Sequence, residues 1–491
     1  MARMTIRRLM GWLLAVPLLS ALAVAATDLP LVEAVKQGNI ALVRSLLNQH
    51  IDVNVPQADG TTALAWAAQQ DDVETADLLI RAGAKVNAAN DYGATPLWMA
   101  CANGNAAMVE TLLKAGADPN THILSGETVL MTTAEAGNTE VVRSLLAHGA
   151  LVSAKENLAG QTPLMWAVAE KHSEVAKVLI EHRADVNARS KRGYTALLFA
   201  AQQGDRDSAE ILLAAGANVN ETADDGTTPL LKASENGQQA FLVFLLNKGA
   251  KPNAADINGY TSLHYAAANR NRLESVKALL AHGANPNARL VKDPAKGDSN
   301  RTPIGATPFL LAAEGRNIAI MRALASAGAD PLLATTETMF SNEANGYRLQ
   351  TVANTTPLMA AAGLGRFNGN YPEFTEAEEK NAVEAVQLTL ELGNDINAAN
   401  EYGQTALHAA AYLKADTLVR FLVEKGAKMD LIDKFGQTPL SIAGRIITEG
   451  VKDSYDLSPR LNNESTVKLL LNLGATPLAA SGVKIYQEPL Q

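Results

Sequence analysis

The histidines, the cysteine and one glycine-rich loop are the residues whose types could do chemistry, and their spacing favours none. The eight histidines form no H-E-x-x-H pattern and no paired Cys/His spacing, which are typical of zinc sites. The chain has no Gly-Lys dipeptide of a phosphate-binding loop and no G-x-S-x-G turn of a serine nucleophile. The glycine-rich run 363–369 follows an expected helix rather than a strand, which favours an inter-helix loop. We therefore expect no enzyme, no metal site and no cofactor.

Aromatic residues at expected turns are the better candidates for function, as contacts for a partner. Five of them flank a turn glycine and are expected on the surface: Tyr92, Tyr194, Tyr260, Tyr402 and Phe435. Three tryptophans instead fall inside expected helices, where packing or an inner groove explains them: Trp66, Trp98 and Trp166.

Two stretches that interrupt the pattern of the chain hold the sharpest aromatic signal. Aromatic residues make up 5% of the chain, yet five fall in the 37 positions 332–353 and 366–380. These five are Phe340, Tyr347, Phe367, Tyr371 and Phe374. Because solvated linkers lack aromatic residues, we expect these stretches to dock, either on the rest of the chain or on a partner.

Binding hot spots favour sheltered aromatic and arginine residues. The candidate partner-binding residues are therefore Phe340, Tyr347 and Arg348, with Tyr402 and Tyr260 on nearby turns and Tyr194 and Tyr92 on earlier ones.

The elements that must position these residues are copies of one unit, which is clearest from Tyr92 to Asn120. Gly93 suits the positive φ of a tight turn. Thr95 is a good N-cap, and Pro96 fits the first helical position, where no amide hydrogen is needed. Gly116 suits the left-handed residue after a second helix. The unit is predicted to be hairpin, helix, turn, helix and exit loop, and it needs neighbours to bury its apolar face.

The unit recurs at a fixed period. Its turn glycines are spaced by 33 or 34 residues at Gly60, Gly93, Gly126, Gly160, Gly193, Gly226 and Gly259. The same G-x-T-[PA]-[LF] signature follows Gly305, Gly403 and Gly436 after longer gaps, and Asn354 replaces the glycine once. With its T-P-L helix start, the chain resembles the ankyrin repeat family from about residue 28 to residue 477.

This resemblance implies an all-α repeat protein, an ankyrin-type α-solenoid of about twelve helix pairs with β-hairpin fingers. The expected organisation is an N-terminal cap at 28–54, regular repeats at 55–287, repeats with insertions at 288–477 and a C-terminal tail at 478–491. The family's T-P-L-H histidine is kept only at His264 and His408, so apolar packing is expected to replace the lattice of such histidines elsewhere.

Two further positions give local predictions. An asparagine recurs four residues after the second-helix glycine, and we expect it to close its own exit turn through side-chain bonds to the backbone. Arg183 stands where Gly83, Gly116, Gly149 and Gly216 stand in other repeats. A left-handed conformation at Arg183 would cost about 1 kcal/mol relative to glycine.

Residues 1–26 differ from the rest and are predicted to be a cleavable signal peptide. Three arginines precede an apolar run from Leu9 to Ala26 that ends in small residues, which favours cleavage near Ala25 or Ala26. An uncleaved membrane anchor is the alternative. Cys101 alone allows no intramolecular disulfide, which favours a bacterial periplasm over an animal extracellular space. The expected location is periplasmic or secreted, with no stable membrane insertion after cleavage.

Charge excludes one class of partner. Residues 1–26 carry three arginines and no acid, so removing them from 42 basic and 51 acidic residues leaves a net charge of −12. An acidic chain without a basic run is a poor nucleic-acid binder. We therefore expect a monomeric, non-catalytic exported scaffold that binds a protein or peptide through the concave ankyrin surface. The alternative is a small-ligand or cell-wall-fragment binding protein with its pocket under the C-terminal insertions.

Overall fold

The structure, a computed structural model, describes residues 29–291, 304–337, 339–343, 346–364, 374–444, 447–448, 464–477 and 485–486. At 339–343, 346–351, 447–448 and 485–486 it describes the backbone alone. The predicted signal peptide lies outside the described residues. The chain divides into two compact units, Met1–Leu124 (unit 1) and Ser125–Gln491 (unit 2).

The described part of unit 1, residues 29–124, forms three helix pairs. They are α2 (Pro30–Lys36) with α3 (Ile40–Asn48), α4 (Ala63–Gln69) with α5 (Val73–Arg81), and α6 (Pro96–Asn103) with α7 (Ala106–Lys114). The first helices α2, α4 and α6 contact one another in sequence, and so do the second helices α3, α5 and α7.

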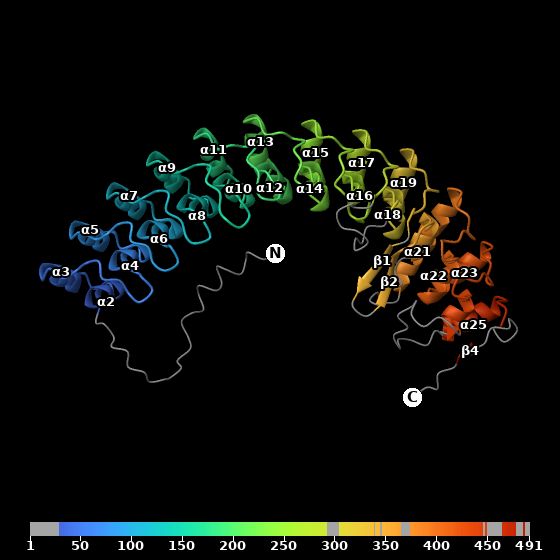
Figure 1. The fold of residues 1–491 in the computed structure, drawn as a ribbon. Coiled ribbons are helices and arrows are strands. Elements are labelled where there is room, and N and C mark those ends of the chain that lie inside the picture. Colours follow the sequence, from blue (N-terminus) through green and yellow to red (C-terminus); the bar gives the residue numbers. More distant parts are fainter. Residues whose placement is uncertain are drawn as a thin grey trace. The chain divides into compact units, whose positions relative to one another are not determined.

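Unit 2 continues the same pattern (Figure 1). Its first helices are α8 (Val129–Ala136), α10 (Pro163–Ala169), α12 (Ala196–Gln203), α14 (Pro229–Glu235), α16 (Ser262–Ala267), α18 (Pro308–Glu314), α20 (Pro357–Ala361), α22 (Ala406–Tyr412) and α24 (Pro439–Ala443). Its second helices are α9 (Thr139–Ala147), α11 (Ser173–Glu181), α13 (Arg206–Ala214), α15 (Gln239–Asn247), α17 (Leu273–Ala281), α19 (Ile318–Ser326), α21 (Glu376–Glu391), α23 (Asp416–Glu424) and α25 (Glu464–Asn472). Numbered by these pairs, the described residues form twelve repeats, as the sequence predicts.

The predicted helix signals act as expected. The side chain of Thr95 accepts a hydrogen bond from the amide of Trp98 at 3.2 Å, and Pro96 occupies the first turn. Gly93 and Gly116 have φ angles of 84° and 92°. Arg183 is left-handed at φ 68°, and Asn354 replaces the turn glycine at φ 63°. Local sequence therefore sets where each helix begins and ends.

The core is a layer of small and branched side chains between the two rows of helices. In α12, Leu197, Leu198, Ala200 and Ala201 are buried, while Phe199 between them is only partly so. Alanine lets neighbouring first helices approach closely, and leucine fills the space toward the second helices. A single repeat has no such layer, so stability arises between repeats.

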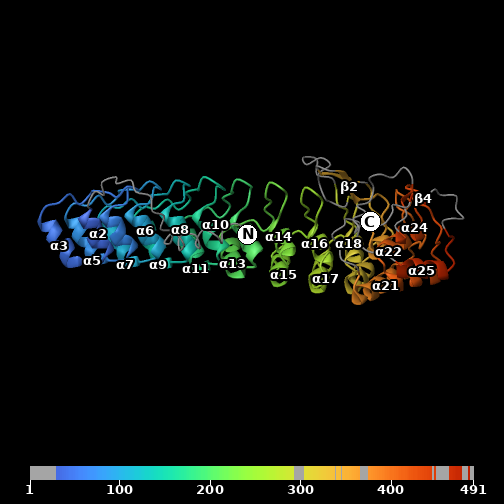
Figure 2. The ribbon, with the colours of Figure 1, turned by 90° about the horizontal axis from the view of Figure 1, so that it is seen from below.

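The loops between repeats, here called fingers, all project to the same side of unit 2 (Figure 2). They are tight turns at the predicted glycines; Ser190 N–H, for example, donates to Tyr194 O at 2.9 Å. One backbone bond links each finger to the next, as from Lys191 N–H to Ala159 O at 2.7 Å. In the described part of unit 2, one isolated β-bridge occurs in a finger, between Ala255 and Thr261.

The recurrent asparagine corrects one prediction, because it joins neighbouring repeats instead of closing its own turn. Asn220 Nδ2 donates to Gly249 O at 3.1 Å, and its Oδ1 accepts from Lys251 N–H at 2.8 Å. The left-handed glycine of the next repeat turns its carbonyl toward the asparagine, so each repeat completes the exit loop before it. Asn287 makes the same pair of bonds to Gly328 and Asp330 across the insertion at 288–303.

Three insertions add local structure. Within 332–353, β1 (Met339–Glu343) pairs antiparallel with β2 (Gly346–Thr351). The insertion 366–380 is helical at its end, since α21 has 16 residues and begins at a capping box formed by Thr375 and Glu378. The sequence signal for this box is a threonine followed three residues later by a glutamate. β3 (Ile447–Thr448) pairs with β4 (Ile485–Tyr486), which joins the insertion 445–463 to the expected tail.

None of the helices among the described residues has the length and apolar character needed to cross a membrane.

Candidate functional site

The fourth residue after the N-cap threonine forms a row along the first helices, on the side that meets the fingers. In repeats five to eight of unit 2 this row is Trp166, Phe199, Lys232 and Tyr265, all partly exposed. Each lies on the helix face opposite the buried leucine and alanine positions. We call these four residues together with Tyr194 and Tyr260 the aromatic row.

Lys232 lies at the centre of the aromatic row and is held by an aromatic ring and a carboxylate. Its Nζ lies 5.8 Å from the ring centroid of Tyr194 and 2.9 Å from Glu235 Oε2. The Tyr194 ring in turn contacts Phe199, with centroids 6.0 Å apart. Burial alone would lower the pKa of Lys232, but Glu235 and Tyr194 outweigh it and the pKa is raised. This part of the surface therefore stabilises an ammonium group.

Tyr260 and Tyr265 form a second contact in the aromatic row. Their rings stack with centroids 5.1 Å apart and an interplanar angle of 26°. Tyr265 Oη donates to Asp256 Oδ2 at 3.3 Å, while Asp256 Oδ1 accepts from the amides of Asn258 and Tyr260. Burial raises the pKa of Tyr260 to about 12 and also raises the pKa of Asp256. The two rings and the carboxylate form a continuous surface at repeat eight.

The other predicted finger residues are not part of this row. Tyr92 of unit 1 is 66% exposed. Tyr402 stacks on Phe435 of the next finger at 5.4 Å, and Lys434 Nζ lies 5.7 Å from the Tyr402 ring centroid. These contacts form a separate patch at repeats eleven and twelve.

The predicted insertion site is described only in its backbone. Phe340 lies on β1, and Tyr347 and Arg348 lie on β2, where Tyr347 pairs with Asn342 and Arg348 with Ser341. Their side chains, and the residues Phe367 and Tyr371, lie outside what the structure describes. Whether the three candidate residues meet a partner stays a prediction.

For Phe374, one of the five aromatic insertion residues, the structure shows that the side chain docks on the rest of the chain. Its ring centroid lies 4.2 Å from the guanidinium carbon of Arg316, whose side chain is buried and donates through Nε to Ala361 O at 3.0 Å. Phe374 therefore packs on the repeats themselves. Glu379 in the same insertion accepts a 3.2 Å hydrogen bond from the amide of Leu418 at the start of α23.

Unit 1 carries a matching arrangement at its own row position. Trp66 donates through Nε1 to Gln57 Oε1 in the finger at 2.7 Å, and Lys36 Nζ lies 4.6 Å from the Trp66 ring. Trp98, at the position of the motif histidine, is partly buried. Trp66 and Trp166 thus hold the same position in their own repeats and are both only partly buried.

His264 and His408, the two motif histidines, join adjacent repeats. His264 Nδ1 accepts from the amide of Thr261 at 3.1 Å, and Nε2 lies 3.1 Å from Ala288 O. His408 repeats this arrangement with Thr405 and Gln437. Burial lowers the pKa of each to about 4, so both are neutral at pH 7 and serve structure.

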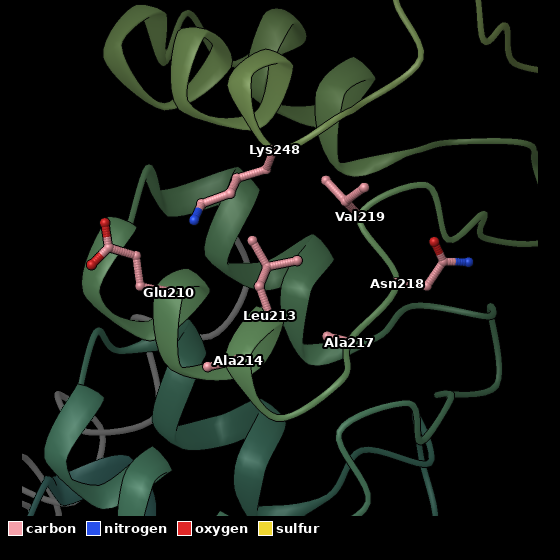
Figure 3. A pocket seen from close by; sticks show the side chains of 7 residues that line it. All are labelled: Glu210, Leu213, Ala214, Ala217, Asn218, Val219 and Lys248. Atoms are coloured by element: carbon pink, nitrogen blue, oxygen red, sulfur yellow. The ribbon is translucent and has the colours of Figure 1, made fainter.

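A hollow of about 490 Å³ opens on α13 and the loop that follows it. Figure 3 shows Lys248 reaching over it from the end of α15, with Glu210 and Leu213 on α13. Glu210 is ion-paired with Arg206 at 2.8 Å. Among the described residues, no group of three histidine, cysteine, aspartate or glutamate side chains could hold a metal ion.

The turn pattern of the sequence indicates Tyr194 and Tyr260 as surface residues but does not indicate Phe199, Lys232 or Tyr265. A signal for them exists, since all three stand four residues after the threonine that the repeat alignment already fixes.

Comparisons with known proteins identify the family. The model described as "Ankyrin repeats (3 copies)" matches residues 31–123, 119–190, 197–290 and 375–452. An ankyrin repeat-containing protein of Schizosaccharomyces pombe is 32% identical over 97 residues, 20% of this chain and 44% of that protein. The zebrafish (Danio rerio) neurogenic locus notch homolog protein 1 is 33% identical over 136 residues, 26% of this chain and 5% of that protein.

Two further matches are viral and human. An ankyrin repeat protein of Fowlpox virus is 28% identical over 188 residues, 37% of this chain and 90% of that protein. The crystal structure of the human ASB11 ankyrin repeat domain matches with 26% identity and a TM-score of 0.39, covering 52% of this chain and 99% of that domain. These relatives are eukaryotic or viral and give no support to a bacterial source.

The family match covers well over half of the chain, and the described helix pairs follow the same period. Proteins of this family are generally non-catalytic, and their repeats typically bind other proteins. The predicted all-α solenoid is confirmed, and the chain belongs to the ankyrin repeat family.

Proposed function

We propose that this chain is a non-catalytic scaffold that binds a protein or peptide across the aromatic row of repeats five to eight. The observation that carries the proposal is the position of Phe199, Lys232 and Tyr265. These three side chains remain partly exposed next to buried neighbours on both sides in sequence. Large, rigid, partly exposed aromatic side chains are the groups that contribute most at protein interfaces.

Selection of peptides on the full chain tests this proposal. Random displayed peptides are selected on the purified protein and then measured against Phe199→Ala/Tyr265→Ala. The matched control is Phe421→Ala/Leu471→Ala on the second helices α23 and α25, where both residues are also partly or fully exposed. We expect the row variant to lose about 2 kcal/mol of binding free energy or more. Equal binding by both variants would refute the row as the site.

The insertion residues are the competing location. A third variant, Phe340→Ala/Tyr347→Ala/Arg348→Ala, is compared with a matched change at exposed finger residues outside the aromatic row, Tyr92→Ala/Leu124→Ala/Ile432→Ala. If the selected peptides lose affinity only in the insertion variant, the binding site lies on β1 and β2 instead. Circular dichroism of each variant separates loss of binding from loss of fold.

Export is a second part of the proposal and rests on residues 1–26 alone. Basic residues, an apolar run and small terminal residues are the three regions of a signal peptide. N-terminal sequencing of the protein purified from its natural source should find a start near Thr27. A protein that begins at Met1 or Ala2 would rule out cleavage and favour the anchor.

A further inference from the structure

We infer that the partner segment bound on the aromatic row is a basic peptide in an extended, three-residue-per-turn conformation, with an arginine or lysine at every third position. This inference rests on the proposed function and names the chemistry of the partner at the same site. It follows from the charges of the surface, from the cations that the surface already holds, and from the spacing of the repeats.

The charges on the first helices and at their C-terminal ends, beside the aromatic row and in the repeats that flank it, are mostly negative. From α8 to α18, the first helices and their C-cap residues carry four carboxylates and one lysine: Glu135, Glu170, Glu235, Glu314 and Lys232. Arg270 and Arg272 are occupied by backbone carbonyls, Gly315 O at 2.9 Å and Glu235 O at 3.1 Å. In the finger of Tyr194, Arg189 is paired with Glu221 and Asp224, Lys191 donates to Asn157 O, and Arg192 is exposed. A basic segment therefore complements this surface, and an acidic one is repelled.

Aromatic rings in each of the two units already hold an ammonium group. Lys232 lies over Tyr194 and Lys36 lies over Trp66, at 5.8 Å and 4.6 Å from the ring centroids. A cation over an aromatic face is stabilised by the ring quadrupole. The Phe199 and Tyr265 rings offer the same kind of face to a cation from a partner.

The spacing of the repeats selects the conformation of the peptide. α10, α12, α14 and α16 contact one another in sequence, and packed helices lie about 8–10 Å apart. A polyproline II segment rises about 3.1 Å per residue with three residues per turn, so equivalent side chains recur about every 9 Å. One side chain in three then meets each successive repeat. A β-strand, with side chains on one face about every 6.6 Å, falls out of step after one repeat.

Synthetic peptides of defined spacing test this with the full chain. The probe is an acetylated and amidated peptide with four copies of Arg-Pro-Ala. The comparison peptides are four copies of Gln-Pro-Ala, four copies of Glu-Pro-Ala, and a peptide of the same composition as the probe with its four arginines consecutive. We expect the probe to bind at least about tenfold more tightly than each of them, and more weakly as salt rises.

Protein variants test the charge of the surface. Glu170→Gln/Glu235→Gln should weaken binding of the probe by about tenfold. The control Glu174→Gln/Glu210→Gln removes two exposed carboxylates from α11 and α13; there Glu210 is paired with Arg206, as Glu235 is paired with Lys232. The control should bind the probe as the unaltered protein does.

Four outcomes are distinguishable. If the glutamine peptide binds as well as the probe and Phe199→Ala/Tyr265→Ala weakens both, the proposed function stands and the basic partner is wrong. If the consecutive-arginine peptide binds as well as the probe, the three-residue spacing is wrong. If the probe binds but is unaffected by the aromatic variant, the site is elsewhere. If neither the probe nor any selected peptide binds, the proposed function itself fails.

Discussion

The fourth position after the N-cap threonine differs sharply between two regions of unit 2. In repeats five to eight it holds Trp166, Phe199, Lys232 and Tyr265, all partly exposed. In repeats nine to twelve it holds Leu311, Ala360, Ala409 and Ile442, all buried. The same position is therefore a core position in repeats nine to twelve and a partly exposed position in repeats five to eight.

The two motif histidines predict that the stability of both regions depends on pH, because each region contains one buried histidine with the same kind of hydrogen bonds. His264 is in repeat eight and His408 in repeat eleven, and burial lowers the pKa of each from 6.5 to about 4. The unfolded chain takes up protons first as pH falls, so stability is complete above pH 6.5 and is lost between pH 6.5 and pH 4. We expect a loss of about 4 kcal/mol for the pair at pH 5, by urea unfolding.

The control for this pH dependence is His148→Gln, which replaces an exposed histidine. His264→Gln/His408→Gln should flatten the curve between pH 5 and pH 7. If the curve keeps its slope in the double variant, other groups cause the acid sensitivity.

Truncation at the fourth position should separate the two regions by stability. Leu311 is 7% exposed and packs with Leu290, Ala306, Leu310 and Ala360. We expect Leu311→Ala to cost about 3 kcal/mol, because it leaves a cavity. Phe199→Ala removes a ring that is already partly in water and should cost about 1 kcal/mol. Urea unfolding followed by circular dichroism measures both. Similar losses would mean that the two regions do not differ as described.

Two arginines with left-handed backbone conformations extend the comparison between the two regions of unit 2. Arg316 at φ 53° is buried against Phe374, whereas Arg183 at φ 68° is exposed. Arg316→Gly relieves the backbone but removes the stacked guanidinium and its bond to Ala361 O, so we expect a net loss of about 2 kcal/mol. Phe374→Ala should lower stability in the same direction. A stabilised Arg316→Gly protein would show that the contact contributes little.

The smallest expected effect is at Arg183. Replacing it by glycine removes left-handed strain without removing a buried contact, so Arg183→Gly should raise the free energy of unfolding by up to about 1 kcal/mol. The thermal midpoint measures this directly. A clear fall in the midpoint would reveal a contact of Arg183 that its exposed position does not suggest.

Local sequence determined the repeat phase, the helix boundaries and the left-handed positions. Thr95, Pro96 and Gly116 act through groups within a few residues of themselves, so their roles follow from a short stretch of chain. The same local rules allowed Arg183 to be identified as left-handed. The capping box of Thr375 and Glu378 also follows from local sequence, because its two residues are only three positions apart.

Only the tertiary structure decided which side chains meet between repeats. Asn220 bonds to Gly249 and Lys251, 29 and 31 residues away, so its own turn gives no sign of its role. Lys232 and Tyr194 come from different repeats and meet because α12 and α14 pack together. Burial at the fourth position depends on the neighbouring repeats, and a single repeat sequence carries no information about its neighbours' packing. The aromatic row is therefore a property of the stack, whereas the repeat that builds it is a property of the sequence.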